Sequence, residues 1–292
     1  MILEQLIRLI REIAEIPSFS SYEEIIHPYI LEKTKELPGI KVHNVPDNNL
    51  ILEIPGRTGA RPVALSAHLD KINHFGEDPP LRLPFKEETS YLEGQMDDAV
   101  GLGICLGLAL QSREEEFPPL LLLLSEMEES FGLKKHPHLL KSQGEGLHHG
   151  IGAERISEFL INEGKLPSCV ITVDTTPLFR GAQGIVVYSK HWHFTKAEPS
   201  DQEKQSTEKL VGRLTKISPG LTLSNNTNDY LTYGKCLNQG GLPSIPSIAI
   251  EPAIYPYHQA NERVFLDDIE GVYSILRSFL LDEAKQARDD DR

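Results

Sequence analysis

The sequence has little cysteine and few cationic side chains. Its cysteines are three in number, scattered and free of Cys-x-x-Cys spacing: Cys105, Cys169 and Cys236. This pattern argues against a disulfide framework and against a thiolate metal site. Isolated thiols are typical of a reducing compartment, so we expect a cytoplasmic protein.

Positive charge is scarce relative to negative charge. The chain of 292 residues has 29 Lys and Arg against 43 Asp and Glu, which gives a formal net charge of −14. Nucleic-acid binding requires cationic side chains that neutralise phosphates, and anionic membrane surfaces repel an acidic protein. The charge balance therefore argues against a nucleic-acid or membrane partner.

Long apolar runs are also missing. The longest covers only residues 120–124, whereas a membrane-spanning helix needs about 20 residues. Residues 1–18 mix charged and apolar side chains, which is typical of an amphipathic helix and not of a signal peptide. Hydrophobic residues at 39% and charged residues at 25% are ordinary for a globular protein, and we expect a packed core.

Apolar periodicity predicts helices that alternate with short strands. Helices are expected at 3–14, 22–37, 99–111, 154–163, 202–214 and 267–287. Strands are expected at 41–45, 49–54, 63–67, 120–125, 169–173, 184–189 and 247–250. Residues 134–150 are expected to form a long surface loop. The alternation favours an open α/β sheet between two helical layers, and the unbroken leucines of 120–124 fit a strand inside a parallel sheet.

His68 and Asp70 end the strand expected at 63–67. Side chains two residues apart on a strand point to the same side, so Asp70 can accept the ring N–H that His68 does not use for a metal. By itself, however, such a short pattern is more typical of a polar strand end.

Two adjacent carboxylates, Asp97 and Asp98, stand directly before the helix expected at 99–111. Capping and the helix macrodipole account for acidic residues at a helix start. Two carboxylates exceed what a cap needs, so a capping role and a ligand role both stay open.

Three carboxylates follow the all-leucine strand: Glu126, Glu128 and Glu129. Grouping them at the end of a buried strand is costly unless a positive charge holds them. Open α/β sheets bind ligands in the crevice outside the carboxyl ends of their strands. We therefore predict a ligand site at this edge of the sheet.

The same event recurs at two later strands. Asp174 ends the strand at 169–173, and His258 lies in a loop rich in Pro and Tyr after the strand at 247–250. Oxygen and imidazole ligands without cysteine suit zinc, cobalt or manganese, and these groups outnumber the ligands of one tetrahedral ion. The pattern favours two metal ions that share a bridging carboxylate.

The motifs AHLD, GQMDDAVG, EMEES, ITVD and YHQANE occur in this order. With them, the chain resembles the dinuclear zinc aminopeptidases of the leucyl and glutamyl type, including the tetrahedral-aminopeptidase branch, over nearly its whole length. The resemblance implies a phosphorylase/hydrolase-like zinc exopeptidase fold, which is a three-layer α/β/α sandwich around a mixed, mostly parallel sheet. It also implies hydrolysis of the N-terminal residue from peptides with a free amino terminus.

The resemblance further implies a ligand set for two divalent ions, most often zinc, with cobalt or manganese as alternatives. By motif, Asp97 would bridge the two ions. His68 and Asp174 would complete one ion, and Glu129 and His258 would complete the other.

Catalytic and supporting roles are implied in the same way. Glu128 would be the general base that takes a proton from the attacking water and delivers it to the leaving amine. Asp70 would orient His68, and Asp98 would be the structural neighbour of Asp97, often across a cis peptide bond in such enzymes.

The spacing of the motifs leaves no room for an inserted domain. Only 26 residues separate Asp70 from Asp97, which is too short for the dimerisation domain of the tetrahedral branch. Another 83 residues separate Asp174 from His258, which is too short for the lid domain of related carboxypeptidases and deacylases. We expect residues 1–292 to form one catalytic domain, and a homo-oligomer is compatible with this.

Three other functions stay open. A glutaminyl-cyclase-like acyltransferase on the same fold works with one zinc, and His68 argues against it because a single-metal enzyme does not need that ligand. An N-acyl amide hydrolase would use the same water chemistry, and a non-catalytic binding homologue would keep the fold alone. No motif identifies the pocket that would select the N-terminal residue.

Several further polar residues are weaker candidates. The Thr227-Asn228-Asp229 segment is similar to the Thr-Asp motif of the tetrahedral branch and suggests a wall of the site. Solvated or lid positions are expected for the histidines of the long loop, and a packed rim for those after the strand at 184–189: His136, His138, His148, His149, His191 and His193.

Overall fold

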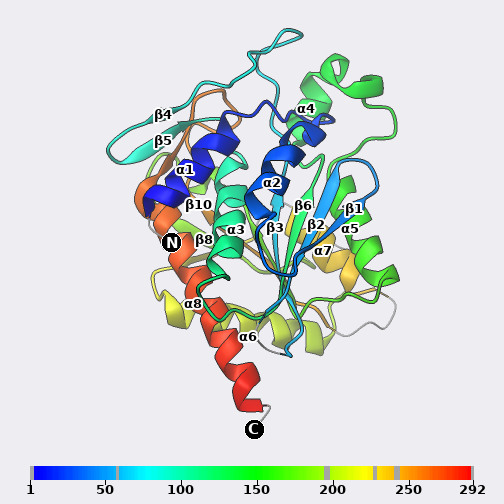
Figure 1. The fold of residues 1–292 in the computed structure, drawn as a ribbon, viewed down its shortest axis with the longest axis vertical. Helices are drawn as coiled ribbons and strands as arrows, with labels where there is room; N and C mark the ends of the chain where they lie inside the picture. Colours follow the sequence, from blue (N-terminus) through cyan, green and yellow to red (C-terminus); the bar gives the residue numbers. More distant parts are fainter. Residues whose placement is uncertain (1–2, 57–58, 194–197, 226–228, 240–243, 291–292) are drawn as a thin grey trace.

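The computed structural model describes residues 3–56, 59–193, 198–225, 229–239 and 244–290. Within these residues, eight strands form one mixed sheet that lies between two layers of helices (Figure 1). From one side to the other, the strand order is β1 (Lys41–Val45), β2 (Asn49–Ile54), β6 (Leu120–Ser125), β3 (Val63–His68), β7 (Cys169–Val173), β10 (Ser247–Pro252), β8 (Ile185–Tyr188) and β9 (Thr222–Ser224). The predicted α/β sandwich is confirmed.

The four central strands β6, β3, β7 and β10 are parallel, whereas β2 and β8 pair antiparallel at their flanks. Parallel strands all end on the same side of the sheet. We call the edge where these four strands end the carboxyl edge, and the edge where they begin the amino edge. Their side chains are almost entirely buried, because helices cover both faces.

Helices cover the sheet on both faces (Figure 1). One face carries α1 (Leu3–Ala14), α3 (Ala99–Gln111) and α8 (Leu266–Asp290), and the other carries α5 (Ile151–Asn162) and α7 (Asp229–Leu237). Two further helices pack on the first layer: α2 (His27–Thr34) against α3, and α6 (Asp201–Ile217) against α8.

Helix α3 is buried around nearly its whole circumference. It has few polar side chains, so it lies between the sheet and α1 and presents apolar surface to both. Gly103 allows the closest approach, because a Cβ atom there would stand only 2.5 Å from the Ile10 side chain of α1. This contact fixes α3 deep in the core, where its first residues reach the carboxyl edge.

The expected helix over 22–37 is wrong in its bounds. Residues Glu23–Ile26 form a 3-10 turn, and α2 begins only at His27. Pro28 fits the first turn of a helix but not its interior, so the α-helix starts there.

The expected loop at 134–150 contains ordered turns. It begins within α4 (Ser130–Lys135) and includes two 3-10 turns, Pro137–Leu139 and Lys141–Gly144. A further 3-10 turn covers Pro177–Phe179.

A second, smaller sheet is not predicted by the sequence. In the described residues, it consists of β4 (Lys86–Glu87), β5 (Tyr91–Gly94) and β11 (Glu262–Phe265). Glu262 lies opposite Gly94, so the pairing joins segments that are far apart in the chain. The consequence is that the loop carrying His258 is fastened beside the segment that leads to Asp97.

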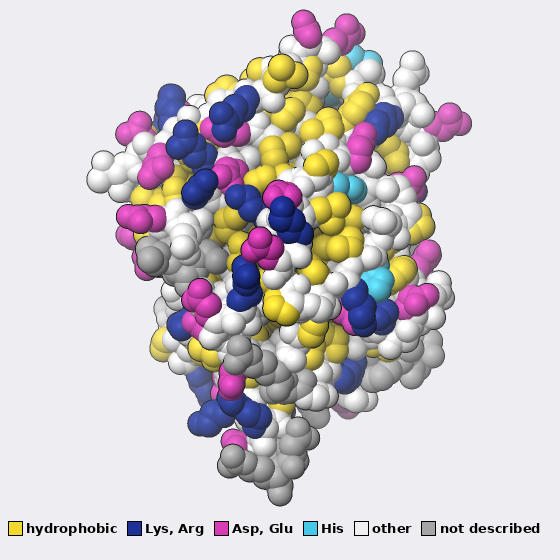
Figure 2. Space-filling model, viewed as in Figure 1, with side chains coloured by type: hydrophobic (Ala, Val, Ile, Leu, Met, Phe, Trp, Pro, Cys, Tyr) yellow, Lys and Arg dark blue, Asp and Glu magenta, His cyan; other side chains and the backbone are white. Residues whose placement is uncertain are grey.

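Acidic and basic side chains are interspersed on the face that carries α1, α3 and α8 (Figure 2). The net charge of −14 is therefore not gathered into a patch of one sign on this face. Across the part of the chain that the structure describes, no helix has both the length and the apolar composition needed to cross a membrane.

Candidate metal centre

The carboxyl edge gathers all the side chains that the sequence predicts as metal ligands. His68 is the last residue of β3, and Asp174 directly follows β7. Asp97 precedes α3, Glu129 follows β6, and His258 lies between β10 and β11. Ligand atoms of these residues form two groups that share Asp97, and within each group all atoms lie within 4.8 Å of one another.

The first group consists of His68, Asp97 and Asp174, all of them buried. His68 Nε2 lies 3.1 Å from Asp97 Oδ1 and 3.7 Å from Asp174 Oδ1. On the parallel neighbours β3 and β7, Ser66 lies opposite Thr172. Two residues further along each strand, the side chains emerge on the same face. The register of the sheet therefore brings His68 and Asp174 together.

The second group consists of Asp97, Glu129 and His258. His258 Nε2 lies 3.4 Å from Glu129 Oε2, and its ring stacks on Tyr257 with the ring centroids 3.6 Å apart. The backbone of His258 has a φ of 54°, which residues other than glycine rarely adopt. Such a conformation in a loop is typical of functional positions.

Asp70 contacts both the predicted ligands and the predicted base. Its Oδ1 lies 3.3 Å from His68 Nδ1 and accepts a hydrogen bond from the Glu128 backbone N–H at 3.0 Å. Its Oδ2 accepts from the Glu129 backbone N–H at 3.1 Å and from the Ser20 hydroxyl at 2.8 Å. One buried carboxylate thus fixes the end of β3 relative to the turn after β6.

The capping role and the ligand role predicted for the Asp97-Asp98 pair belong to different residues. Asp98 is the N-cap of α3, since its Oδ1 accepts the Gly101 backbone N–H at 2.7 Å. Asp97 belongs to both candidate ligand groups. The peptide bond between them is cis. Gly101 is required here because a Cβ atom would stand 2.1 Å from the Val173 carbonyl oxygen of β7.

Glu126 and Glu128 have different surroundings although they are two residues apart. Glu126 is buried, accepts a hydrogen bond from Asn49 Nδ2 at 2.6 Å and pairs with Arg155. Glu128 Oε2 lies 4.0 Å from His68 Nε2, and no Lys or Arg in the described residues pairs with it. The additional carboxylate of the EMEES motif is therefore structural, and Glu128 is the one that faces the ligands.

Asp97, Glu128 and Glu129 are buried without a Lys or Arg partner in the described residues, and burial raises their pKa values. Burial, followed by the charge of Asp174, raises the pKa of Asp97 to about 6. Burial likewise raises the pKa values of Glu128 and Glu129 well above the ordinary value. For His68, burial alone lowers the pKa, but contacts with carboxylates, Asp174 first, raise it well above the usual range.

The donor set fits divalent cations. The two groups offer carboxylate oxygen and imidazole nitrogen and no thiolate, which suits zinc, cobalt or manganese. Burying carboxylates costs several kcal/mol per ion unless a positive charge compensates them. In the described residues, the only side chains that form ion pairs with the carboxylates of this centre are histidines. Divalent cations would supply the missing charge.

Glu262 is a supporting residue that the sequence analysis does not find. Its Oε2 accepts the backbone N–H groups of Met96 at 2.9 Å and Asp97 at 3.2 Å. Its Oε1 accepts the Gln259 backbone N–H at 3.3 Å. One carboxylate therefore ties the shared ligand Asp97 to the loop of His258. Its position at the end of the YHQANE motif was the available signal.

Two more buried ionisable residues near the centre have no sequence signal. Lys71 is 2% exposed and donates to the Ser18 hydroxyl at 2.9 Å. Burial lowers its pKa to about 8, although the charges of Asp70 and Asp98 counteract this. Glu251 at the end of β10 is 4% exposed, and burial raises its pKa well above the ordinary value. Lysine and glutamate are mostly exposed in proteins, so their burial is not expected from sequence.

Asp229 begins α7 and lies in the wall of the centre. Its Oδ2 accepts a hydrogen bond from the Ser125 hydroxyl at the end of β6 at 2.7 Å. The charge of Asp229 contributes to the raised pKa of Glu128, after burial and other neighbours. Thr227 and Asn228 of the same predicted motif lie outside the described residues.

Three other candidate histidines have defined neighbours. His149 Nδ1 contacts the Glu128 backbone carbonyl, so the end of the 134–150 loop reaches the metal centre. His148 pairs with the exposed Glu154 at 3.1 Å. His191 follows β8, which runs toward the amino edge, and it packs against Gly234 of α7.

Comparison with known proteins identifies the fold through structure. No family model matches the chain. Nor does any curated protein sequence match it. An aminopeptidase from the archaeon Desulfurococcus kamchatkensis superposes with a TM-score of 0.66 at 15% identity, over 96% of this chain and 95% of that one.

Two other solved structures are similar to the same extent. The TET1 peptidase of Pyrococcus horikoshii, which can assemble into a tetrahedron or a large octahedral shell, has a TM-score of 0.63 at 15% identity, over 94% of this chain and 99% of that one. A tripeptidase from Staphylococcus aureus has a TM-score of 0.65 at 14% identity, over 98% of this chain and 99% of that one. The similarity at these identities is one of fold.

Proposed function

We propose that this chain is a metal-dependent aminopeptidase that removes the N-terminal residue from peptides. One observation carries the proposal: two groups of histidine and carboxylate ligands meet at Asp97, with Glu128 beside them and no Lys or Arg of the described residues paired to it. Such a site suits hydrolysis of an unactivated amide bond. The peptide substrate is supported by the similar structures, which are named as an aminopeptidase and a tripeptidase.

The proposed cofactor is a pair of divalent cations, with zinc as the first choice and cobalt or manganese as alternatives. His68 and Asp174 would hold one ion, Glu129 and His258 the other, and Asp97 both. When bound, the cations supply Lewis-acid polarisation of the scissile carbonyl and lower the pKa of water.

Glu128 is proposed as general base and then as general acid. Its carboxylate accepts a proton from the attacking water as the water oxygen bonds to the scissile carbonyl carbon. When the C–N bond breaks, Glu128 returns the proton to the leaving amine nitrogen. Burial is the main cause that raises the pKa of Glu128, and a higher pKa makes its carboxylate a stronger acceptor for the proton of the water. Asp70 positions Glu128 by accepting its backbone N–H.

We further propose one catalytic domain over residues 1–292 and a cytoplasmic location. A single domain is supported by one sheet order that uses strands from both halves of the chain. The cytoplasm is supported by the three cysteines, which are all free thiols.

The function is tested with aminoacyl anilides and their N-acetylated counterparts. Protein stripped of metal with a chelator is reloaded with zinc, cobalt or manganese. Release of the aniline from all substrates, and of acetate from the N-acetylated ones, is measured over a panel of aminoacyl groups. We expect turnover of free-amine substrates only, and only after reloading. Faster hydrolysis of the N-acetylated substrates would identify an N-acyl amide hydrolase instead. No turnover of either class with any of the metals would contradict the proposal.

The glutaminyl-cyclase alternative has its own readout. Cyclisation of a glutaminyl peptide releases ammonia and leaves a pyroglutamyl terminus, whereas an aminopeptidase releases free glutamine. Metal analysis separates the two further, since we expect about two ions per chain and a cyclase would hold one.

A further inference from the structure

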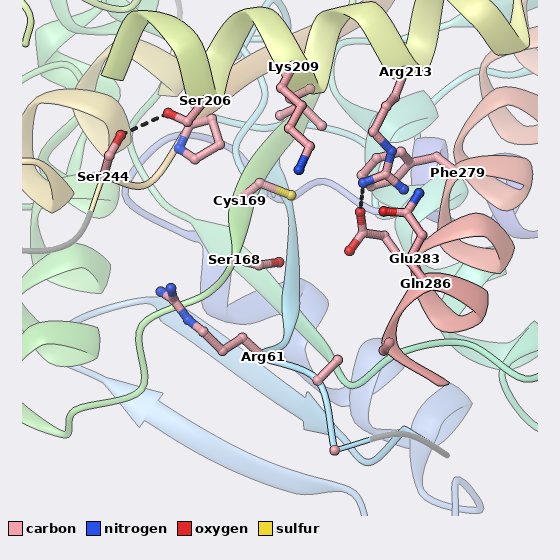
Figure 3. Close-up of a pocket in the computed structure, with 15 residues that line it drawn as sticks. Arg61, Ser168, Cys169, Ser206, Lys209, Arg213, Ser244, Phe279, Glu283 and Gln286 are labelled. Atoms are coloured by element: carbon pink, nitrogen blue, oxygen red, sulfur yellow. Dashed lines mark hydrogen bonds and ion pairs between the residues drawn. The ribbon is translucent and has the colours of Figure 1, made fainter. Parts of the chain in front are cut away.

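A cavity, drawn in Figure 3, lies at the amino edge of the sheet. The candidate metal centre lies at the opposite, carboxyl edge. The volume of the cavity is about 440 Å³, and it opens between α6 and α8 above the first residue of β7. Small-molecule sites have volumes of roughly 300–1,000 Å³, so the space is sufficient for a small ligand. None of the proposed metal ligands lines it.

Two cationic side chains of this cavity have no acidic partner. Arg61 donates to the Pro167 carbonyl at 2.6 Å, and within the described residues it forms no ion pair. Lys209 extends from α6 into the middle of the cavity and, in the same described part of the chain, pairs with no carboxylate (Figure 3). Unpaired cations that face one cavity stand out in a chain with a net charge of −14.

The one carboxylate in the lining does not cancel these charges. Glu283 pairs with Arg213, which also donates to Asp282 at 2.7 Å. The Arg213 guanidinium lies over the Phe279 ring, 4.7 Å from its centroid. Arg213 therefore pairs with two carboxylates and forms a fixed wall that adds no positive charge, and the cations left to bind a ligand are Arg61 and Lys209.

The rest of the lining is neutral. Ala60 and Ala287 are half-buried and present methyl groups to the cavity. The Ser168 hydroxyl donates to the Pro62 carbonyl at 3.2 Å, and the Ser206 hydroxyl donates to the Glu203 carbonyl at 3.0 Å. The Cys169 thiol at the floor is buried, and burial raises its pKa to about 12, so it is neutral. The cavity thus combines two cations with a neutral wall.

We propose that this cavity binds a small organic anion. The carboxylate or phosphate group of the ligand would lie between Arg61 and Lys209, where charge-assisted hydrogen bonds are strongest. The hydrocarbon body of the ligand would contact Ala60 and Ala287. The site is independent of the proposed peptidase function, because it shares no residue with the metal centre.

Isothermal titration calorimetry with phenyl phosphate and benzoate tests the proposal, at constant ionic strength and with benzyl alcohol as the neutral analogue. We expect one of the two anions to bind at one site per chain and benzyl alcohol to bind much more weakly. Which anion binds more tightly identifies the acidic group of the natural ligand. Absence of binding by both anions, or equal binding of benzyl alcohol, would overturn the proposal.

Three charge variants locate the site. Lys209→Gln and Arg61→Gln should each raise the Kd about tenfold, because each removes one charge-assisted hydrogen bond. Lys216→Gln is the matched control, since Lys216 is an exposed cation of the same helix that does not line the cavity. An equal loss in Lys216→Gln would show general charge attraction and refute a site. Arg61 and Lys209 are exposed, so the variants should keep the wild-type Tm and metal content.

Discussion

Carboxylates at the two edges of the central sheet have opposite surroundings. At the amino edge, Glu53 is surrounded by Lys41, His43 and Lys165, all within 3.2 Å of its carboxylate. Hydrogen bonds to these neighbours, Lys165 first, lower the pKa of Glu53 to about 2. At the carboxyl edge, Asp97 has no such cation in the described residues, and burial raises its pKa to about 6.

This difference indicates which carboxylates of the chain are available to bind a cation or a substrate. A carboxylate with several cationic neighbours stabilises the fold, and its charge is already compensated, so it does not need a bound cation. A buried carboxylate without them destabilises the fold until an ion or substrate supplies the charge. The same contrast occurs over two residues at the end of β6, where Glu126 pairs with Arg155 and Glu128 does not pair with Lys or Arg in the described residues.

The largest expected effect comes from Asp97→Asn. Asp97 belongs to both ligand groups, so its loss should weaken both proposed metal positions together. We expect metal content to fall from about two ions per chain to well below one, and turnover to fall below detection. Metal analysis after gel filtration checks this. Retention of two ions with normal turnover would show that the edge does not hold metal through Asp97.

Glu128→Gln should separate catalysis from metal binding. The amide cannot accept the water proton, and general-base catalysis contributes about 10²–10⁴ in rate. We expect kcat to fall by that amount while metal content stays unchanged. The measurement is kcat for an aminoacyl anilide alongside metal analysis.

Glu126→Gln is the matched control for that variant. Glu126 lies two residues away and pairs with Arg155, so its loss should lower Tm and leave kcat within a few-fold of wild type. A large loss of kcat in Glu126→Gln, with full activity in Glu128→Gln, would reverse the roles of the two residues.

Glu262→Gln should weaken metal binding without removing a ligand. Its carboxylate accepts the backbone N–H groups of Asp97 and Gln259, so it positions the shared ligand and the His258 loop. Loss of such support typically costs 10–100-fold in metal affinity. Competition with a chromogenic chelator measures the change.

The control for Glu262 lies in the same small sheet. Glu93 of β5 pairs with Lys86 and Arg263 and contacts none of the ligands in the described residues. Glu93→Gln should therefore leave metal affinity unchanged. Equal losses in both variants would mean that the small sheet acts through stability and not through positioning.

The smallest expected effect is at the amino edge. Glu53→Gln removes a half-buried ion-pair network worth about 1 kcal/mol, so Tm should fall by roughly 2 °C at pH 7. The folded pKa of Glu53 is lowered to about 2 from 4.5, so its stabilisation is present above pH 4.5 and disappears as pH falls toward 2. In thermal melts between pH 7 and pH 3, the Tm difference between the two proteins should shrink as the pH falls below 4.5.

Glu87→Gln serves as the reference for that measurement. Glu87 is exposed on β4 and forms no ion pair in the described residues, so its loss should not change Tm at any pH. A Tm difference between Glu53→Gln and wild type that stays constant with pH would show that the carboxylate charge does not stabilise the fold.

Much of the fold could be predicted because local patterns determined it. The strand at 120–125 is unbroken leucine, and the helix at 99–111 is apolar on all sides, so both had to be central. The small sheet was missed because β5 and β11 are short, and their pairing depends on contacts between Gly94 and Glu262, distant in sequence. Short strands of this kind carry no periodicity.

The candidate ligands could be predicted for a similar reason. His68 and Asp174 follow parallel strands, and strand direction alone places strand ends at one edge. The burial of Lys71 could not be predicted, because it follows from the packing of neighbouring segments. Glu262 stands in the YHQANE motif, but its contact with Asp97 depends on the pairing of β5 with β11. The role of Asp98 follows only from the structure, in which its carboxylate accepts the Gly101 backbone N–H and caps the helix.

Asp70 has a consequence for any attempt to redesign this protein. Its two oxygens contact His68 and the backbone of Glu128 and Glu129, so a proposed ligand of each ion and the proposed base share one support. The positions of these residues therefore depend on one another through Asp70. A substitution that retunes metal preference through His68 will also move Glu128, so variants of the two positions should be selected together and not in succession.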